Sequence, residues 1–376
     1  MESKYKIAYV LSDLKRVGPS NQTLNIIDNS KYKNNSIVIT LFDEPKDTMI
    51  DEYIEKNINV ISLKLNRTGF LLNGEKKLSN LLNKYQVKLI HSYGIKADNI
   101  SQKVANKLNI IHIITLRNYP KEDILTRMNF IKGRIALFEH LRVLLNCNNV
   151  ICCSKTICEK MQKDYPMQKF SYIQNGVDIK KYRNMSESEI TKLKEKNDLS
   201  KYNRIFVSIG SFIKRKRIDE TINIFLNLHT KNDCILLLGS GELEEEIKSK
   251  YKAENIIFLG KCNNVADYLN CADYLISSSE SEGLPNAVIE SIACNTPVIL
   301  SNIDQHKEIF NEIGDVGIYY KLGNVEDCVE KIKKIDKEKY LYYKENCNNI
   351  HNSVFTMKNM SQKYVEYYEK VGIKDV

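Results

Sequence analysis

The sequence predicts an α/β fold built from two Rossmann-like domains. Apolar segments of strand length alternate with amphipathic segments of helix length along the chain, a pattern typical of parallel βαβ units. This series is interrupted once, by the polar segment 178–204, and then starts again. The length of 376 residues also favours two hydrophobic cores over one.

The expected strands are short apolar segments bounded by polar or turn-forming residues. In the first half of the chain they are 6–11, 36–42, 60–65, 89–93, 110–116, 150–154 and 172–174. In the second half they are 205–209, 234–238, 256–259, 274–278 and 297–301, and a helical segment follows each of them.

The domain boundary is expected within 178–204, which is rich in lysine and glutamate and contains little apolar periodicity and no strand candidate. We therefore assign 1–180 to an N-terminal domain and 181–354 to a C-terminal domain. If the two domains face each other, the loops at the carboxyl ends of both sheets meet at one cleft.

The composition is that of a soluble folded protein, with 43% hydrophobic and 27% charged residues. The apolar segment 7–11 is too short for a signal peptide, and no apolar run reaches the roughly 20 residues that cross a bilayer. The ten cysteines are scattered without a Cys-x-x-Cys pair, so we expect reduced core thiols. These features predict a cytoplasmic protein.

The net charge of +9 favours an anionic partner, which can be a nucleotide, a phospholipid surface or a nucleic acid. The charge alone does not choose among these partners. No cluster of carboxylates and histidines has the spacing of a metal site, so no metal is expected.

The most informative segment is 277–290, with the sequence Ser-Ser-Ser-Glu-Ser-Glu-Gly-Leu-Pro-Asn-Ala-Val-Ile-Glu. A strand ends here, and Pro285 is expected as the first residue of the next helix, where its missing N–H costs nothing. The free N–H groups and positive dipole of such a helix end favour phosphate oxygens, and Gly283 lets the backbone approach closely.

Glu290 lies among apolar residues on nearly all sides of this helix. A carboxylate in such surroundings is costly unless it is hydrogen-bonded, and two vicinal ribose hydroxyls can satisfy both of its oxygens. The alternative is that donors from the protein, or solvent, satisfy Glu290.

Glu282 and Glu290, with seven residues between them and Gly-Leu-Pro after the first, resemble the Glu-x7-Glu signature of retaining glycosyltransferases of family four, which have the GT-B fold. The resemblance implies that Glu290 binds the donor ribose and that Glu282 contacts the sugar or its phosphate. It also assigns the loop residues Gly283, Leu284, Pro285 and Asn286 to the donor site.

A second informative segment, 206–219, contains a strand, a glycine and four consecutive cations before a helix. It resembles the family's Gly-Arg-x-x-x-x-Lys-Gly turn, whose arginine and lysine bind the donor diphosphate. Taken alone, such a run of cations is more typical of a solvated loop or a nucleic-acid patch. The residues assigned to the diphosphate site are Gly210, Ser211, Arg215, Lys216 and Arg217; Lys216 has the lysine position, Ser211 the arginine position, and Arg215 or Arg217 is the hypothetical replacement.

Weaker matches extend the resemblance over nearly the whole chain. They are Asn175-Gly-Val-Asp178, Leu238-Gly-Ser-Gly-Glu242 and Phe258-Leu-Gly260, and with them Gly239, Gly241 and Lys261 are assigned to the donor site. A dinucleotide-binding turn at Gly239 is the rival interpretation, but Glu244 stands where its third glycine is needed. The segment 355–371 resembles the family's last helix, so 355–376 is expected to pack back on the first domain.

The acceptor side is assigned from loops of the first domain. Gly18 and Pro19 follow the first strand and can bring backbone amides near a phosphate, although a simple turn is the alternative. Arg117, followed by Asn118, ends the fifth strand where relatives often carry a histidine facing the donor sugar. A guanidinium cannot act as a general base, but it can bind phosphate or an acidic acceptor. His91 is interpreted as structural.

The segment 124–145 mixes basic and apolar residues at helical spacing. Basic amphipathic helices can lie on anionic membranes, and many members of the family extend lipid-linked sugars at the inner membrane face. A peripheral contact with the inner face of the plasma membrane is therefore one expectation, and a core helix with a basic outer face is the other. The basic residues are Arg127, Lys132, Arg134 and Arg142.

The resemblance implies transfer of a hexosyl or N-acetylhexosaminyl group from a nucleotide diphosphate sugar, with UDP the commonest nucleotide, to a glycan or lipid-linked acceptor in capsule or lipopolysaccharide synthesis. Glu282, Lys216 and Arg117 are assigned to catalysis, which is electrostatic and needs no metal or other cofactor. A nucleotide-sugar epimerase of the same fold is the first alternative. A nucleic-acid-binding protein is the second, and the absence of tryptophan and of an RNA-binding aromatic motif opposes it.

Overall fold

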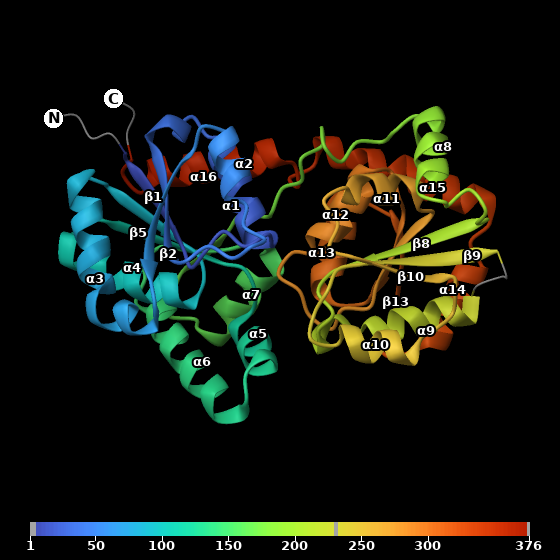
Figure 1. Cartoon of the computed structure of the whole chain (residues 1–376), viewed down its shortest axis with the longest axis horizontal. Helices are drawn as coiled ribbons and strands as arrows, with labels where there is room; N and C mark the ends of the chain where they lie inside the picture. The colour runs from blue at the N-terminus through green and yellow to red at the C-terminus, as the bar shows by residue number, and fades with distance from the viewer. Residues whose placement is uncertain (1–4, 229–231, 374–376) are drawn as a thin grey trace. The chain divides into compact units, whose positions relative to one another are not determined.

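The structure is a computed structural model, and it describes residues 5–228 and 232–373, without the side chain of Arg127. The chain forms two compact units: unit 1 consists of Met1–Gly176 and Met357–Val376, and unit 2 consists of Val177–Thr356. Each unit contains one parallel sheet with helices on both faces (Figure 1). The predicted α/β class is confirmed.

Unit 1 is built on seven parallel strands. These are β1 (Ile7–Leu11), β2 (Ser36–Phe42), β3 (Asn59–Leu65), β4 (Leu89–Ser92), β5 (Ile111–Leu116), β6 (Val150–Cys152) and β7 (Phe170–Tyr172), in the order β3-β2-β1-β4-β5-β6-β7. The helices are α1 (Gly18–Asp28), α2 (Ile50–Glu55), α3 (Arg67–Lys84), α4 (Ile95–Leu108), α5 (Pro120–Arg127), α6 (Phe130–Leu145), α7 (Lys155–Asp164) and α16 (Met357–Lys370).

Unit 2 is built on six parallel strands. These are β8 (Arg204–Ile209), β9 (Asp233–Leu238), β10 (Ile256–Gly260), β11 (Tyr274–Ser277), β12 (Val298–Ser301) and β13 (Gly317–Tyr320), in the order β10-β9-β8-β11-β12-β13. The helices are α8 (Glu187–Lys196), α9 (Ile218–Leu228), α10 (Glu244–Lys250), α11 (Val265–Cys271), α12 (Asn286–Ala293), α13 (Asp304–Ile313), α14 (Val325–Lys333) and α15 (Lys337–Cys347). Figure 1 shows α11 and α12 on one face of this sheet and α9, α10 and α14 on the other.

Three elements differ from the prediction. The expected strand 172–174 is wrong, since β7 ends at Tyr172, and β13, which has only four residues, was not predicted. The segment 178–204 contains α8, which buries none of its residues. A capping box fixes its start, because Ser186 accepts from the N–H of Glu189 and the Glu189 carboxylate accepts from the N–H of Ser186. A helix without a buried face leaves no apolar periodicity in the sequence.

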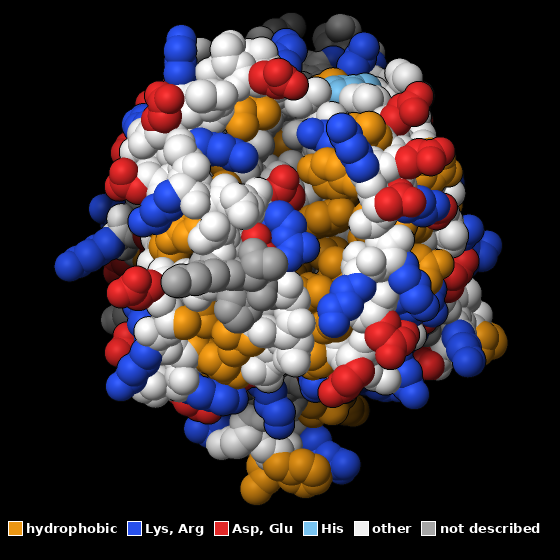
Figure 2. Space-filling view, turned by 90° about the vertical axis from the view of Figure 1, so that its right-hand side faces the viewer, with side chains coloured by type: hydrophobic (Ala, Val, Ile, Leu, Met, Phe, Trp, Pro, Cys, Tyr) orange, Lys and Arg blue, Asp and Glu red, His pale blue; other side chains and the backbone are white. Residues whose placement is uncertain are grey.

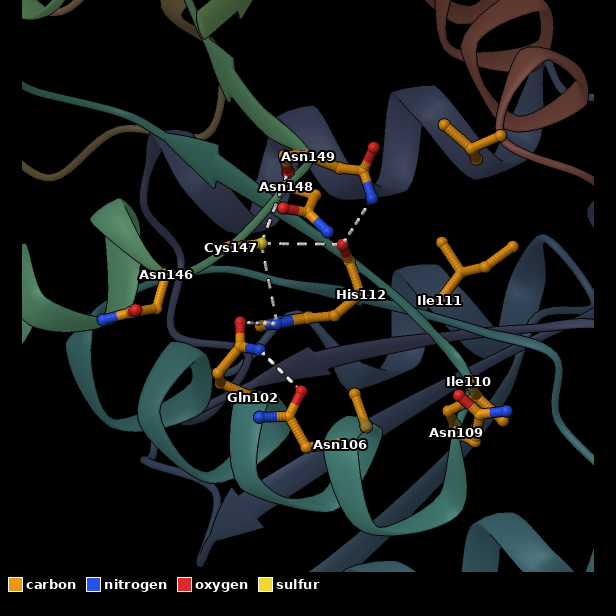
Figure 3. A pocket seen from close by; sticks show the side chains of 12 residues that line it. Gln102, Asn106, Asn109, Ile110, Ile111, His112, Asn146, Cys147, Asn148 and Asn149 are labelled. Carbon is orange, nitrogen blue, oxygen red and sulfur yellow. Dashed lines mark hydrogen bonds between the residues drawn. The ribbon is translucent and has the colours of Figure 1, made fainter. Parts of the chain in front are cut away.

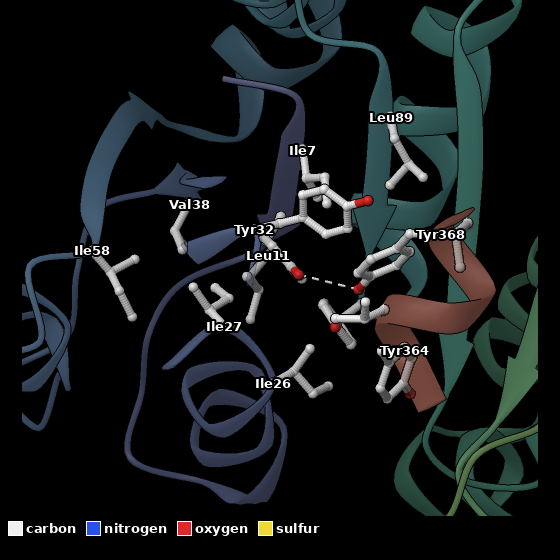
Figure 4. Close-up of a cluster of buried hydrophobic side chains, with 14 of the residues drawn as sticks. Ile7, Leu11, Ile26, Ile27, Tyr32, Val38, Ile58, Leu89, Tyr364 and Tyr368 are labelled. Atoms are coloured by element: carbon white, nitrogen blue, oxygen red, sulfur yellow. Dashed lines mark hydrogen bonds between the residues drawn. The ribbon is translucent and has the colours of Figure 1, made fainter. Parts of the chain in front are cut away.

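Strand β1 contributes to the core on both faces of the unit 1 sheet. Ile7, Tyr9 and Leu11 pack in a cluster with residues of α1 and α16 (Figure 4), and the alternate residues Ala8 and Val10 belong to the cluster under α3 and α4. The Tyr9 and Tyr368 hydroxyls lie 3.1 Å apart, so the last helix of the chain is bonded to the first strand.

The ten cysteines form no disulfide, and eight of them are buried, which confirms the prediction of reduced core thiols. Within the described chain, the helices are all too short or too polar to cross a bilayer. Basic and acidic side chains are interspersed over the face shown in Figure 2. The net positive charge is therefore not gathered in one patch on that face.

Candidate functional site

The candidate site of unit 2 lies where the strand order of its sheet reverses. The chain passes from β8 to β9 on one side, whereas β11 pairs with β8 on the other side. Ligands of open α/β sheets bind at the carboxyl ends of the strands beside such a reversal. The loops after β8 and β11 meet here, and they carry the predicted residues Lys216 and Glu282.

Glu282 is buried and paired with two cations. Its Oε1 accepts a hydrogen bond from the ammonium group of Lys216, and its Oε2 lies 3.3 Å from Nη1 of Arg215. Burial alone raises the pKa of this carboxyl, but the charges of Lys216 and Arg215 outweigh burial and lower the pKa to about 2. Glu282 is therefore ionised, and it fixes Lys216 at the end of the sheet.

The two arginines beside Lys216 have different partners. Arg215 is buried and donates from Nη1 to the carbonyl oxygen of Ser281 as well as to Glu282, while its Nε has no described hydrogen-bond partner. Arg217 donates from Nε to Oε2 of Glu220 at 2.6 Å. Of the two proposed replacements for the arginine missing at position 211, Arg215 lies beside Glu282 and Arg217 is directed to another glutamate.

Three predicted glycines allow the loops after β8 and β9 to pack closely. Gly239 has a φ of +141°, and a Cβ atom there would lie 1.8 Å from the carbonyl oxygen of Gly210. A Cβ atom at Gly241 would lie 2.4 Å from the carbonyl oxygen of Phe212. The geometry gives Gly239 and Gly241 a packing role, and their assignment to the donor stays a prediction.

Helix α12 begins one residue later than predicted. Pro285 is the N-cap residue, with a φ of −74°, and Asn286 is the first helical residue. The N–H groups of Val288 and Ile289 both bond to the carbonyl oxygen of Pro285, so these two donors are already used. Gly283 and Leu284 are buried in the loop before the helix.

Glu290 is half-buried on α12, and among the described residues it forms no ion pair. Burial raises the pKa of its carboxyl to about 7, although the Lys181 charge and a hydrogen bond from the Tyr182 hydroxyl both lower it. The Tyr182 hydroxyl therefore acts on the Glu290 carboxylate, in line with the alternative of a donor from the protein. One tyrosine hydroxyl does not satisfy two carboxylate oxygens, so Glu290 keeps acceptor capacity.

Two other predicted residues are exposed to solvent. Ser211 is exposed, and Lys261 is exposed after β10, the edge strand, with β9 between β10 and β8. No described contact joins either residue to Glu282. Their assignment to the donor site stays a prediction.

In unit 1, Arg117 and Asn118 directly follow β5, and Gly18 and Pro19 form the first turn of α1. Arg117 donates from Nη1 to Oδ1 of Asn175 at 2.6 Å. Its guanidinium lies over the ring of Tyr93, 5.0 Å from the ring centre. The four predicted residues thus lie at the carboxyl end of the sheet.

His91 is fully buried, and both of its ring nitrogens are hydrogen-bonded. Nδ1 lies 2.7 Å from the Tyr368 hydroxyl and Nε2 lies 2.7 Å from the Thr115 hydroxyl. Burial, the charge of Arg117 and His112 lower its pKa well below the ordinary value, so the ring is neutral. The interpretation of His91 as structural is confirmed.

Comparison with known proteins gives matches over the whole chain. Residues 189–354 match the family described as Glycosyl transferases group 1. The O-antigen biosynthesis glycosyltransferase WclY of Escherichia coli is 24% identical over 97% of this chain and 98% of its own. An Escherichia coli UDP-Gal:alpha-D-GlcNAc-diphosphoundecaprenol alpha-1,3-galactosyltransferase is 24% identical over 92% of both chains. The crystal structure of Anabaena HepE in complex with UDP-glucose has a TM-score of 0.83 at 18% identity, over 97% of this chain and 99% of HepE.

The chain is a glycosyltransferase. The likeness to HepE and the two parallel sheets show the predicted GT-B fold. The family match begins within α8 and extends beyond α15, and so it includes the Lys216–Glu282 pair and Glu290.

The sequence missed one buried histidine beside the site of this glycosyltransferase. His306, on α13, has its Nδ1 2.7 Å from the Ser301 carbonyl oxygen, and no described residue bonds its Nε2. Burial lowers the pKa of His306 to about 4, and the charges of Glu282 and Lys216 both act on the ring. A lone histidine at the start of a helix gives no sequence signal for this location.

A pocket of about 470 Å³ in unit 1 of the glycosyltransferase contains none of the predicted residues. Figure 3 shows carboxamides around it, including Gln102 and Asn106 of α4 and Asn149 before β6, with His112 bonded to Gln102. It lies at the amino ends of β5 and β6, at the edge of the sheet opposite Arg117. We assign no role to it. In the described ranges, no three metal-ligating side chains form a cluster.

Proposed function

We propose that this glycosyltransferase moves a hexosyl or N-acetylhexosaminyl group from a UDP-sugar to a glycan or lipid-linked acceptor, in the synthesis of a cell-surface polysaccharide such as capsule or lipopolysaccharide. The anomeric configuration is retained, and neither a metal nor another cofactor takes part. The similarity to WclY, to the galactosyltransferase and to HepE, which was crystallised with UDP-glucose, supports the donor and the acceptor class.

The observation that carries the proposal is the Lys216–Glu282 pair at the end of the unit 2 sheet, followed on α12 by Glu290. Lys216 offers a fixed positive charge to the leaving diphosphate, and Glu282 keeps the ammonium group in place. Glu290 offers oxygens to ribose hydroxyls one to two helical turns into α12. Unit 1 supplies the acceptor side, with Gly18, Pro19, Arg117 and Asn118 at the edge of its sheet.

A thermal-shift screen of UDP-, GDP- and ADP-sugars tests the donor, because a ligand bound only by the native state raises the apparent melting temperature. We expect stabilisation by UDP-sugars, and a much smaller shift in Glu290→Ala. Glu326→Ala, which changes an acidic residue in the first turn of α14, is the matched control and keeps the full shift. No shift with any of these donors contradicts the proposal.

Product analysis tests the reaction. We expect NMR of the product to show the anomeric configuration of the donor sugar, and no conversion of the UDP-sugar to its epimer when acceptor is absent. Inversion contradicts the retaining mechanism, and acceptor-independent epimerisation supports the alternative enzyme.

We propose a peripheral membrane contact through α6. Its inward residues are Gly133, His140, Val143 and Leu144, so its outer face should be polar in a soluble protein. Instead Ile131, Ile135 and Phe138, spaced three or four residues apart, are 71%, 56% and 70% exposed. An apolar stripe with cations beside it fits an anionic lipid surface. The exposed cations are Lys132, Arg134 and Arg142.

Liposome sedimentation tests this contact. We expect the protein to bind vesicles that contain anionic phospholipid at low salt, and Ile135→Ser with Phe138→Ser to reduce binding at least tenfold. Met167→Ser, which removes an apolar side chain that is 97% exposed elsewhere in unit 1, is the control. Wild-type protein that ignores anionic vesicles contradicts the contact. The cytoplasmic location stays a prediction.

A further inference from the structure

We infer that Arg117 binds an oxyanion, a phosphate or carboxylate group, at the carboxyl end of the unit 1 sheet. The inference rests on the proposed function for the identity of the substrates and on the geometry of unit 1 for the site itself. It assigns to Arg117 the binding of a charged group rather than the transfer of a proton.

The guanidinium of Arg117 is only partly satisfied by the protein. Nη1 donates to the Asn175 side chain, whereas Nε and Nη2 are enclosed and have no hydrogen-bond partner among the described residues. Buried N–H donors without acceptors destabilise the folded state, and more so when the group is charged. Such a group calls for an acceptor that the chain does not provide.

Arg117 also lacks the counter-ion that comparable arginines have. The other described arginines whose side chains are buried or half-buried each pair with a carboxylate: Arg16 with Glu52, Arg204 with Asp233, Arg215 with Glu282 and Arg217 with Glu220. No described carboxylate lies within ion-pair distance of Arg117. Arg215, which is buried, and three partly exposed arginines thus have a carboxylate partner, and Arg117 is the exception among the described arginines that are at least half-buried.

The described side chains that the Arg117 guanidinium contacts, Asn175 and Tyr93, are uncharged. Its charge acts on Tyr53, Tyr93 and Tyr364, whose pKa values burial raises, and on the neutral ring of His91. A cation among neutral aromatic groups is stabilised by the ring of Tyr93, but by less than a carboxylate would provide. The charge of Glu44 also acts on Tyr53, but among the described residues no carboxylate forms an ion pair with Arg117.

The first turns of α1 lie beside the same residues. The Tyr53 hydroxyl donates to the carbonyl oxygen of Ser20, and the side chain of Gln22 bonds to Gly176, next to Asn175. No acidic residue stands in the first turn of α1, and Val17 provides no side-chain cap. The amino terminus of this 11-residue helix therefore adds a positive potential near the guanidinium.

Two substrates can provide the oxyanion: the diphosphate of the nucleotide sugar, or a phosphate or carboxylate on the acceptor. An NMR titration that observes the ¹⁵N–¹H group of arginine Nε separates them. The Arg117 signal is assigned by its loss in Arg117→Lys. Inorganic phosphate and UDP are added to separate samples of the full chain, with sodium chloride matched for ionic strength.

We expect inorganic phosphate to shift the Arg117 Nε signal. A shift with UDP as well identifies the donor diphosphate as the source, and a shift with phosphate but not UDP identifies the acceptor. Both results support the inference. No shift with either probe overturns it, while UDP binding seen at other signals leaves the proposed donor site intact.

A stability measurement gives a second readout that a purely structural arginine would not produce. In phosphate-free buffer we expect Arg117→Met to raise the melting temperature by about 2 °C, because it removes an uncompensated enclosed charge. The same variant should lose the stabilisation that phosphate gives to the wild type. Arg204→Met is the control: it removes the guanidinium that pairs with buried Asp233, so the melting temperature should fall and the response to phosphate should persist. A lower melting temperature in Arg117→Met with an unchanged phosphate response overturns the inference.

Discussion

The carboxyl ends of the two sheets treat positive charge in opposite ways. In unit 2, Lys216 and Arg215 share the buried carboxylate of Glu282, and Arg217 pairs with Glu220. In unit 1, Arg117 has a carboxamide and an aromatic ring as partners, with no described carboxylate. An acid beside the cations fixes their geometry before any ligand arrives, whereas a cation without an acid is completed only by its ligand.

We expect the largest effect when the Glu282 carboxylate of unit 2 is removed. Glu282→Gln leaves buried Arg215 and Lys216 without their counter-ion, so we expect the free energy of unfolding to fall by about 3–5 kcal/mol. Urea unfolding measures the change. Glu75→Gln, which breaks an exposed pair with Lys107 in unit 1, is the control and should have a far smaller effect. Equal effects in the two variants would mean that Glu282 does not organise the unit 2 cations.

Loss of the cation itself should act on turnover. Lys216→Ala is expected to lower kcat by about 10²–10³, the usual effect of removing one group that stabilises charge in the transition state. Lys214→Ala removes an exposed lysine from the same short helix and should leave kcat nearly unchanged. Steady-state kinetics with the donor found in the thermal screen measure both. If Lys216→Ala turned over at nearly the wild-type rate, the proposed role of Lys216 in stabilising the leaving diphosphate would be wrong.

The pH dependence of nucleotide binding tests Glu290. Its pKa of about 7, compared with an ordinary 4.5, means that the carboxylate forms mainly between pH 6 and 8. If ribose hydroxyls need the ionised form, UDP binding should tighten roughly tenfold over this range in the wild type. Isothermal titration calorimetry should show no such change in Glu290→Gln.

The raised pKa of Glu290 also predicts how the stability of the fold changes with pH. Between pH 4.5 and 7 the unfolded chain has released this proton while the folded chain keeps it, so stability falls as pH rises through that window. Glu290→Gln should lack this decline. A flat profile in the wild type would show that Glu290 is ionised at lower pH than its burial implies.

The smallest expected effect comes from adding a cation to unit 2. Ser211 is exposed at the family's arginine position, and Ser211→Arg should tighten UDP binding a few-fold, because an exposed charge is screened by solvent. Calorimetry at low and high salt measures the gain, which should shrink with salt. Weaker UDP binding in Ser211→Arg would indicate that the cations around Glu282 already provide the positive charge that the diphosphate needs.

The fold could be predicted because most of the strands are visible in the sequence as short apolar segments. Buried parallel strands such as β8, β9 and β12 are continuous apolar runs. When helical segments separate such runs, the common arrangement is a parallel sheet with helices on both faces. Helix α8 escaped because its stability comes from a capping box rather than from an apolar face. Strand β13 escaped because four residues beginning at a glycine carry too little pattern.

The residues of the candidate site could be selected from the sequence, but their partners could not. Motif spacing identified Lys216 and Glu282, yet it could not show that Glu282 bonds Lys216, because residues 66 positions apart meet only through the order of the strands. The contact of Tyr182 with Glu290 was hidden in a segment without periodicity. The unpaired state of Arg117 is a property of its surroundings, which no local motif records.

The position of α16 has a consequence for synthesis of the protein. Unit 2 is one continuous stretch, but unit 1 needs residues from both ends of the chain. On the ribosome, the later-encoded unit can therefore finish folding first, while the earlier one waits for Tyr364 and Tyr368 to emerge. A premature stop codon shortly before Met357 would leave unit 2 whole and deprive unit 1 of part of its core.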